Sequence, residues 1–296
     1  MPTPWKVSLH GGHSGDYCDH ATGSLTEVLD AAVAFGYTTF GVTEHAPRVH
    51  EKFLFEEELR RRWGVAKLAE MFDAYAAELA RLSGEYAGRL EVLRAFEAEA
   101  VPDESYPELM LGYRERYGFD YMVGSVHHVQ EVIIDGPPEL FHRAADSAGG
   151  LEPLSVAYYG AVARMVRALR PEVVSHLDLI RRNAPSPDAV ETPRARDAAF
   201  RALDSVAEVG AILDLNTAGI RKGLGCPYPR PWLLREAHAR GIPFCFGDDS
   251  HAPEQVGFGL DAARAYLLEN GIRSITALTR QGPGVVRKVV PLDAEK

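Results

Sequence analysis

Seven short apolar runs recur along this chain of 296 residues, and a helical pattern follows most of them. The runs begin near residues 5, 38, 90, 121, 173, 211 and 243. Strands that alternate with helices are typical of a parallel sheet, and this many units over this length favour a closed barrel over an open, doubly wound sheet. The sequence therefore predicts an α/β fold, a TIM-like barrel that forms a single domain over residues 1–296.

Helices are predicted wherever apolar residues recur at spacings of three and four. The expected helices cover 25–35, 57–83, 106–117, 153–169, 194–209, 231–240 and 260–268. The first begins after Ser24, which has the capping-box spacing to Glu27, and ends before Gly36. Segment 130–150 contains Gly-Pro-Pro and Gly-Gly and is expected to be a loop, while 285–290 is expected to be an apolar tail.

Each predicted strand ends close to a side chain that could bind a metal ion. These side chains are His10, His45, Glu97, His127, His176, Asn216 and Asp249. The carboxyl ends of parallel barrel strands face one cleft, so the seven side chains are expected to converge there. A single histidine at a strand end is usually structural, but a set that occupies every strand end indicates a metal site.

The N-terminal loop strengthens this interpretation because His10, His13 and His20 lie within eleven residues, separated by glycines. Neutral imidazole is the commonest metal ligand, and glycine lets the backbone turn tightly enough for several rings to converge. Nitrogen and oxygen donors suit Zn, Mn or Fe, and there are more of them than one tetrahedral ion can use. We therefore expect two to three divalent metal ions, with Glu97 as the bridging carboxylate.

The cysteines are not among the expected ligands. Cys18, Cys226 and Cys245 are odd in number and far apart, which indicates reduced thiols in a cytoplasmic protein. Of the remaining histidines, His128 is expected to be structural, and His50, His142 and His238 are expected at the surface. Glu44 and Glu99 lie beside proposed ligands and would either orient them or be solvated.

Taken together, the motifs resemble the polymerase and histidinol phosphatase (PHP) superfamily, specifically its histidinol-phosphate phosphatases. The motifs are H-G-G-H at 10–13, T-E-H-A-P at 43–47, F-E-A-E at 96–99, G-S-V-H at 124–127, S-H-L-D at 175–178, N-T-A-G-I-R at 216–221 and D-D-S-H-A-P-E at 248–254. The resemblance implies a distorted (β/α)7 barrel with a trinuclear metal site. It also implies hydrolysis of a small phosphomonoester, L-histidinol phosphate, to L-histidinol and phosphate, a reaction of histidine biosynthesis.

The same resemblance implies a ligand set for each of three metal ions. The first ion would be bound by His10, His13, Glu97 and Asp249, the second by Glu97, His127 and His176, and the third by His20, His45 and His251. Asp249 is preferred to Asp248 because it keeps the D-x-H spacing to His251.

The spacing from His10 to His13 departs from the H-x-H that is usual in the family. In a regular strand, residues three apart point to opposite faces, so both histidines can bind one metal only if the backbone bulges. We therefore predict a positive φ at Gly11 or Gly12.

For the phosphate, the resemblance suggests Arg221, whose guanidinium matches two phosphate oxygens. Arg181 and Arg182 are weaker candidates for the same task, and Asn216 is a further candidate for substrate binding. Asp178, two residues beyond His176, is a candidate for orienting water or protonating the leaving oxygen.

The net charge of −10 argues against nucleic acid or an anionic membrane as a partner. The sequence contains no signal-peptide core and no apolar run long enough to span a bilayer, so export and membrane insertion are not expected. The oligomeric state stays open.

Three other functions remain possible on these residues. The first is an amidohydrolase-like reaction at C–N bonds, but such sites often use a carbamylated lysine at a strand end, and none of the six lysines ends a strand ahead of the ligands. The second is another PHP phosphoesterase or a nuclease that acts on nucleotides. The third is a catalytically silent metal-binding barrel, which loss of a ligand would mark, and no ligand is lost.

Overall fold

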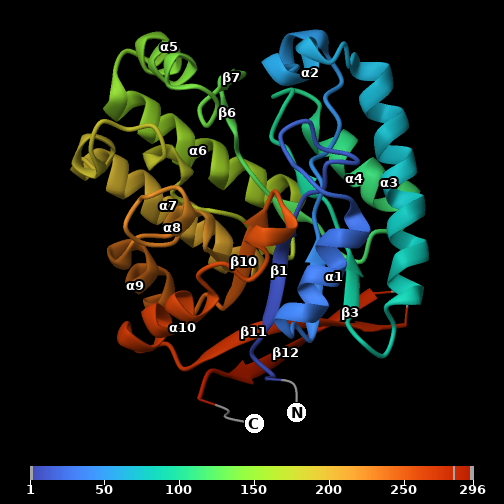
Figure 1. The fold of residues 1–296 in the computed structure, drawn as a ribbon. Helices are drawn as coiled ribbons and strands as arrows, with labels where there is room; N and C mark the ends of the chain where they lie inside the picture. The colour runs from blue at the N-terminus through green and yellow to red at the C-terminus, as the bar shows by residue number, and fades with distance from the viewer. Residues whose placement is uncertain (1–2, 283, 294–296) are drawn as a thin grey trace.

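The computed structural model describes residues 3–282 and 284–293, and its centre is a curled sheet in which all neighbouring strands are parallel (Figure 1). The strands of this sheet are β1 (Val7–Gly12), β2 (Thr39–Val42), β3 (Glu91–Arg94), β4 (Glu97–Ala98), β5 (Val123–Gly124), β8 (Val173–Val174), β9 (Ile212–Asn216) and β10 (Phe244–Ser250). Their order is β3-β2-β1-β10-β9-β8-β5-β4. All seven predicted runs contribute to it.

One segment closes the sheet. Strands β3 and β4 follow each other within residues 91–98, yet β3 pairs with β2 at one edge and β4 pairs with β5 at the other. A further parallel bridge joins Glu97 to His45, just beyond β2. Because the 91–98 segment forms both edges, seven chain segments make up the barrel. The predicted distorted (β/α)7 barrel is confirmed.

Helices cover the outside of the barrel (Figure 1). They are α1 (Leu25–Phe35), α2 (Glu56–Arg60), α3 (Val65–Glu85), α4 (Tyr106–Tyr117), α6 (Leu151–Leu169), α7 (Pro193–Val209), α9 (Pro231–Ala239) and α10 (Leu260–Glu269). The predicted capping box is present in α1, since the Glu27 carboxylate accepts from the Ser24 backbone N–H at 2.7 Å, and Gly36 ends that helix with φ 89°. No helix within the described residues is long and apolar enough to cross a membrane.

The sequence interpretation was wrong at two places between the strands. The helix expected over 57–83 is two helices, because the chain turns at 61–64 before α3 begins at the N-cap Gly64. The loop expected over 130–150 contains a hairpin, β6 (His128–Val129) and β7 (Val132–Ile133), and helix α5 (Pro138–Ala148). Proline is well suited to the first helical turn and glycine to the position after the last, so Pro138 and Gly149 bound a helix here.

Short helical turns complete the connections. They are η1 (Glu51–Phe53), η2 (Leu179–Arg181), η3 (Pro187–Val190), η4 (Pro253–Gln255) and the four-residue α8 (Ala218–Arg221). Of these, α8 directly follows β9 and presents Arg221 at the carboxyl end of the barrel.

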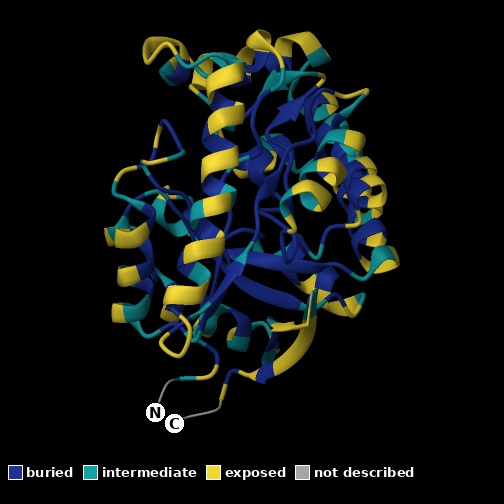
Figure 2. Cartoon of the chain, turned by 90° about the vertical axis from the view of Figure 1, so that its right-hand side faces the viewer, coloured by how far each residue is buried: buried dark blue, intermediate teal, exposed yellow. Residues whose placement is uncertain are grey.

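The other end of the barrel is covered by an antiparallel hairpin of β11 (Ser274–Gln281) and β12 (Gly284–Pro291), which lies below the amino ends of the strands in Figure 1. The expected apolar tail is therefore a strand. Ile275, Leu278 and Val290 of this hairpin are buried, whereas Val289 is 67% exposed. Figure 2 shows the same contrast for the whole chain, with a buried barrel inside helices that expose their outer faces.

Candidate metal centre

Glu97 lies at the middle of a cluster of imidazoles at the carboxyl end of the barrel. Its side chain is 1% exposed. The distances from its carboxylate oxygens to the nearest imidazole nitrogens are 3.0 Å for His45, 3.2 Å for His176, 3.4 Å for His127, 3.6 Å for His10 and 3.7 Å for His13. Four chain segments therefore bring five histidines to one carboxylate, as the positions at the strand ends predicted.

The donor atoms fall into groups that resemble the expected ligand sets. His10, His13 and Asp249 offer donors within 4.8 Å of one another, and so do Glu97, His127 and His176. These groups correspond to the first and second expected sites, with Glu97 between them. For the third, His20 Nε2 and His251 Nε2 are 3.1 Å apart, and the ring of His45 lies 5.5 Å from that of His20.

Several of these atoms have no hydrogen-bond partner although they are buried. They include His10 Nε2 and both ring nitrogens of His13, and both residues are completely buried. A buried polar atom without a partner is costly, so such atoms are rare in native proteins unless an ion or water satisfies them. Unpartnered nitrogens beside ionised carboxylates fit divalent metal ions of the Zn, Mn or Fe type.

The charges of the cluster favour bound cations. Burial alone would lower the pKa of His45, but Glu97 and Glu99 outweigh it and raise that pKa to about 10. Burial also works against the positive charge on His127, and the same two carboxylates raise its pKa to about 9. Conversely, burial would raise the pKa of Glu97, but His127, His10 and His45 hold it well below its usual range. The carboxylates thus remain ionised and require positive partners, which are either protons on the histidines or metal ions.

A bulge brings His10 and His13 to the same side. Between Ser8 and Gly12, strand β1 advances four residues while β2 advances two, from Phe40 to Val42. Gly12 has φ 147°, which confirms the predicted positive φ in the His-Gly-Gly-His segment. A Cβ at Gly12 would lie 2.2 Å from the carbonyl oxygen of Ser250, so no larger residue fits there.

Asp249, and not Asp248, points into the cluster. Its carboxylate is 3.6 Å from His13 Nε2, and its backbone has φ 48°, a conformation uncommon outside glycine. Asp248 instead accepts hydrogen bonds from the Tyr37 hydroxyl and, at 2.6 Å, from the N–H of Gly257. Burial raises the pKa of Asp248 to about 6.

Carboxylates behind the histidines hold the rings in place. His127 Nδ1 is 2.8 Å from Glu99. Glu44 accepts from the N–H of Ser14 at 2.7 Å, and its second oxygen lies 3.4 Å from His13 Nδ1 without forming a hydrogen bond to it. His10 Nδ1 lies 2.9 Å from Asp214. Such partners fix the ring orientation and raise the basicity of the nitrogen that faces the metal. Asp214 was missed from the sequence, although it shares the face of β9 with Asn216 and alternation could have indicated it.

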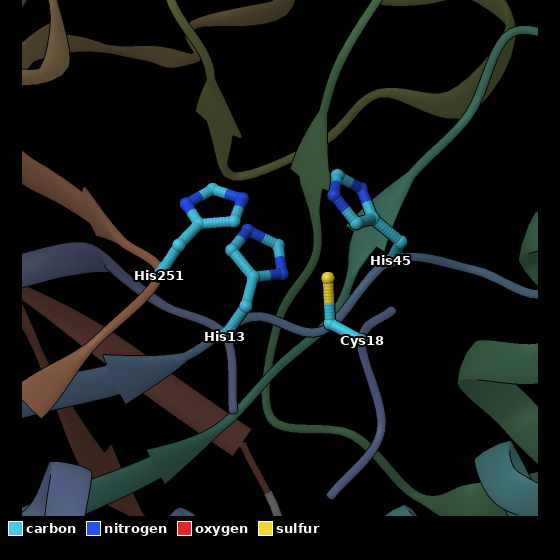
Figure 3. A group of neighbouring side chains, drawn as sticks. All are labelled: His13, Cys18, His45 and His251. Carbon is cyan, nitrogen blue, oxygen red and sulfur yellow. The ribbon is translucent and has the colours of Figure 1, made fainter. Parts of the chain in front are cut away.

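Cys18 also points toward the cluster. Figure 3 shows its sulfur directed at the rings of His13, His45 and His251, and these four side chains offer donors within 4.8 Å of one another. The sulfur is 3.3 Å from His20 Nδ1. Burial and the nearby Glu44 raise the pKa of this thiol well above its usual value, so it stays protonated unless a cation is bound.

Three of the expected substrate or catalytic residues do not line the cavity. Asp178 is 3% exposed, forms an ion pair with Arg181 at 3.0 Å and accepts from the N–H of Arg230. Arg181 donates to the backbone carbonyls of residues 224, 226 and 227 and so holds the 224–230 loop. Asn216 donates to Asp214 and Asp249 and supports the ligands. Each of these three side chains is engaged within the protein, and their contact with the substrate stays a prediction.

A cavity of about 200 Å³ opens over the cluster. Besides candidate ligands, it is lined by Arg182, Arg221, Lys222 and Asp135. Arg221 donates to the carbonyl oxygens of Asp248 at 3.1 Å and Asp249 at 2.5 Å, which leaves other N–H groups of its guanidinium free to bind a ligand. Arg182 and Arg221 therefore lie where the sequence analysis expected them, and Lys222 adds a cation that it missed.

The remaining histidines lie outside the cluster. His128 is 6% exposed and stacks on Phe55, and burial lowers its pKa to about 4. His50, His142 and His238 are exposed. Both results agree with the sequence interpretation.

The PHP domain family model matches residues 10–218 of the chain, a span that contains seven of the nine expected ligands. This chain belongs to the PHP family. A Schizosaccharomyces pombe protein named "Probable histidinol-phosphatase" is 35% identical to this PHP protein over 294 residues, which cover 97% of this chain and 94% of that protein. The histidinol-phosphatase of Saccharomyces cerevisiae is 28% identical over 295 residues, 88% of each chain.

Solved structures of the same family share the fold. The histidinol phosphate phosphatase of Lactococcus lactis, solved in complex with zinc, L-histidinol and phosphate, matches with a TM-score of 0.71 and 18% sequence identity. The match covers 95% of this PHP protein and 99% of that chain. The barrel described above is thus the fold of that phosphatase.

Proposed function

We propose that this PHP protein is a metal-dependent phosphomonoesterase that hydrolyses L-histidinol phosphate to L-histidinol and phosphate. The observation that carries the proposal is the cluster around Glu97, where five imidazoles meet one buried carboxylate beneath a cavity lined by cations. The relatives named histidinol-phosphatase, which align over nearly the whole chain, support the choice of substrate.

The donor set would hold two to three divalent ions, with Zn, Mn and Fe as the candidates. His10, His13 and Asp249 would hold the first with Glu97, while Glu97, His127 and His176 would hold the second. His20, His45 and His251 would hold the third, with Cys18 beside them. When bound, such ions supply an activated water nucleophile and neutralise charge on the phosphate oxygens.

The side chains around the cavity prepare it for a phosphate dianion. Arg221 is fixed by two backbone carbonyls at the end of β10, so its guanidinium is oriented before the substrate arrives. Arg182 and Lys222 line the same cavity and add positive charge. A phosphomonoester carries more charge on its terminal oxygens than a diester, so this concentration of cations favours monoesters.

Phosphate release from L-histidinol phosphate by the metal-replete protein tests the proposal. The rate should far exceed that on bis(p-nitrophenyl) phosphate or on single-stranded DNA, and a chelator should abolish it. A preference for either diester would replace the phosphatase proposal with the nuclease alternative. Activity on neither class, with all metals bound, would favour the silent barrel.

A further inference from the structure

The metal cavity continues into a second, larger cavity on one side. This outer cavity has a volume of about 620 Å³ and lies between the η1 to α2 segment and the β6-β7 hairpin. His20, Asp135 and Arg182 line both cavities, so they mark the passage between them. If the phosphate occupies the metal cavity, the rest of the substrate extends past these residues.

Asp135 supplies the carboxylate at this passage, and it is not a candidate metal ligand. The Asn183 side-chain amide donates to the carbonyl oxygens on both sides of it, at 3.1 Å to Ile134 and 2.9 Å to Gly136. The N–H of Ile134 in turn donates to the carbonyl of His127 at 2.9 Å, which ties the segment to the metal centre. Asp135 is therefore held in place by its backbone, as expected of a binding group that must be positioned before the ligand arrives.

The carboxylate of Asp135 also lies beside a cation. Its Oδ2 atom is 3.1 Å from Arg182 Nη1, and its side chain is 18% exposed. The passage thus presents a negative and a positive group next to each other. A phosphomonoester with an ammonium group on the carbon next to the ester carbon presents the same two charges in complementary order.

We propose that Asp135 binds the ammonium group of a 2-aminoalkyl phosphate while Arg182 turns toward its phosphate. The ion pair between Asp135 and Arg182 is thereby replaced by two, Asp135 with the ammonium group and Arg182 with the phosphate. No charge is left unpaired in the partly buried passage. The side chain of the substrate would then enter the outer cavity, whose walls include Phe53, Phe55 and Ile133. This inference rests on the proposed phosphatase function and adds a residue that selects the substrate.

The test uses pairs of substrates that differ only in the amino group. The first pair is L-histidinol phosphate and its analogue with hydrogen in place of the amine, and the second is 2-aminoethyl phosphate and ethyl phosphate. A charge-assisted hydrogen bond contributes on the order of a tenfold to hundredfold preference. Wild-type kcat/KM should favour the amine by that factor, and Asp135→Asn should remove the preference while leaving the amine-free members within about threefold.

Glu131→Gln is the matched control. It also removes one negative charge from the wall of the outer cavity, but Glu131 pairs with Lys52 and does not reach the metal cavity. This variant should keep the amine preference, and all three proteins should contain equal amounts of metal.

Two outcomes would overturn the inference. One is an equal loss on both members of each pair in Asp135→Asn, which would indicate that Asp135 only positions Arg182. The other is a wild-type enzyme without any amine preference. If L-histidinol phosphate were a poor substrate but 2-aminoethyl phosphate were still favoured through Asp135, the inference would stand and the assigned substrate would fall.

Discussion

The two ends of the barrel both bury charged side chains, but they treat them differently. At the amino end, Oδ2 of Asp120 accepts from the Arg94 backbone N–H at 2.8 Å and from the Arg280 guanidinium at 2.6 Å, and Oδ1 accepts from the Arg94 guanidinium at 3.1 Å. Glu91 accepts from the hydroxyl of Thr279 and the N–H of Arg280, each at 2.8 Å. At the carboxyl end, His10 Nε2 and both ring nitrogens of His13 have no hydrogen-bond partner.

This difference separates stability from function. Paired charges, Asp120 and Glu91 with their partners on β11, connect the β11-β12 hairpin to the barrel and serve the fold. Unsatisfied donors at the other end cost stability in the metal-free protein and are expected where a ligand supplies the missing partner. Substitutions at the carboxyl end should therefore change activity and leave stability largely intact, and substitutions at the amino end should do the reverse.

The largest effect is expected from removing the metals. Chelation should lower kcat/KM on L-histidinol phosphate by about 10³-fold or more, because metal ions supply several kcal/mol of transition-state stabilisation. Far-UV circular dichroism should change little, since the buried core and the amino-end network do not depend on the metals. Readdition of Zn or Mn should restore activity. Full activity in protein with less than one metal ion per chain would contradict the assignment of activity to a metal centre at the carboxyl end.

Asp214→Asn tests the support behind a ligand. The substitution removes the charge that faces His10 Nδ1 at 2.9 Å, and such supports typically contribute about tenfold to hundredfold to metal affinity. Competition with a chromophoric chelator measures that affinity. Asp204→Asn is the control, because Asp204 pairs with Arg240 on the surface. Equal metal affinity in the two variants would remove Asp214 from the metal centre.

Arg221→Lys should lower kcat/KM about tenfold or more, which corresponds to about 1.4 kcal/mol. Lysine cannot keep both backbone contacts at the end of β10 and still offer a fork to the phosphate. The metal content and the melting temperature should stay near the wild-type values. Unchanged kinetics would mean that Arg221 only supports the strand end.

The smallest effect on activity is expected at the amino end. Arg280→Met leaves Asp120 with fewer partners and should lower the free energy of unfolding by about 1 kcal/mol, because Arg280 is partly exposed and solvent screens its charge. The kcat/KM should stay within about twofold of wild type. Arg287→Met, on the exposed side of β12, is the control and should change neither property. Loss of activity in Arg280→Met without loss of stability would contradict the assignment of stability to the amino end and activity to the carboxyl end.

Acid should weaken the same amino-end network. Burial would raise the pKa of Asp120, but Arg280 and Arg94 outweigh it and lower that pKa in the folded protein. A depressed folded pKa means that this contribution is complete above the unfolded value of about 4 and is lost as pH falls through the folded value. Denaturation with urea at pH 7 and pH 3 should therefore show a smaller difference between wild type and Arg280→Met at the lower pH.

Local patterns in the sequence were sufficient for the barrel and for the positions of the expected ligands. Strand and helix periodicity identified all seven barrel segments. Parallel strands place their carboxyl ends at one face, so residues at those ends had to converge there. The His-Gly-Gly-His spacing likewise required a bulge, since side chains alternate along a strand.

Tertiary packing decided what the sequence could not. Whether an arginine or an aspartate near a strand end faces the cavity depends on partners far away in the chain: Arg181 binds carbonyls of the 224–227 loop, while Arg221 faces the cavity. Asp214 and Asp135 acquire their roles from His10 and Arg182, which are distant in sequence. The sequence by itself thus determined which side chains reach the carboxyl end of the barrel, because periodicity is local. Only the tertiary structure decided which of them are satisfied by the protein and which remain available to metal and substrate, because hydrogen-bond partners are set by long-range contacts.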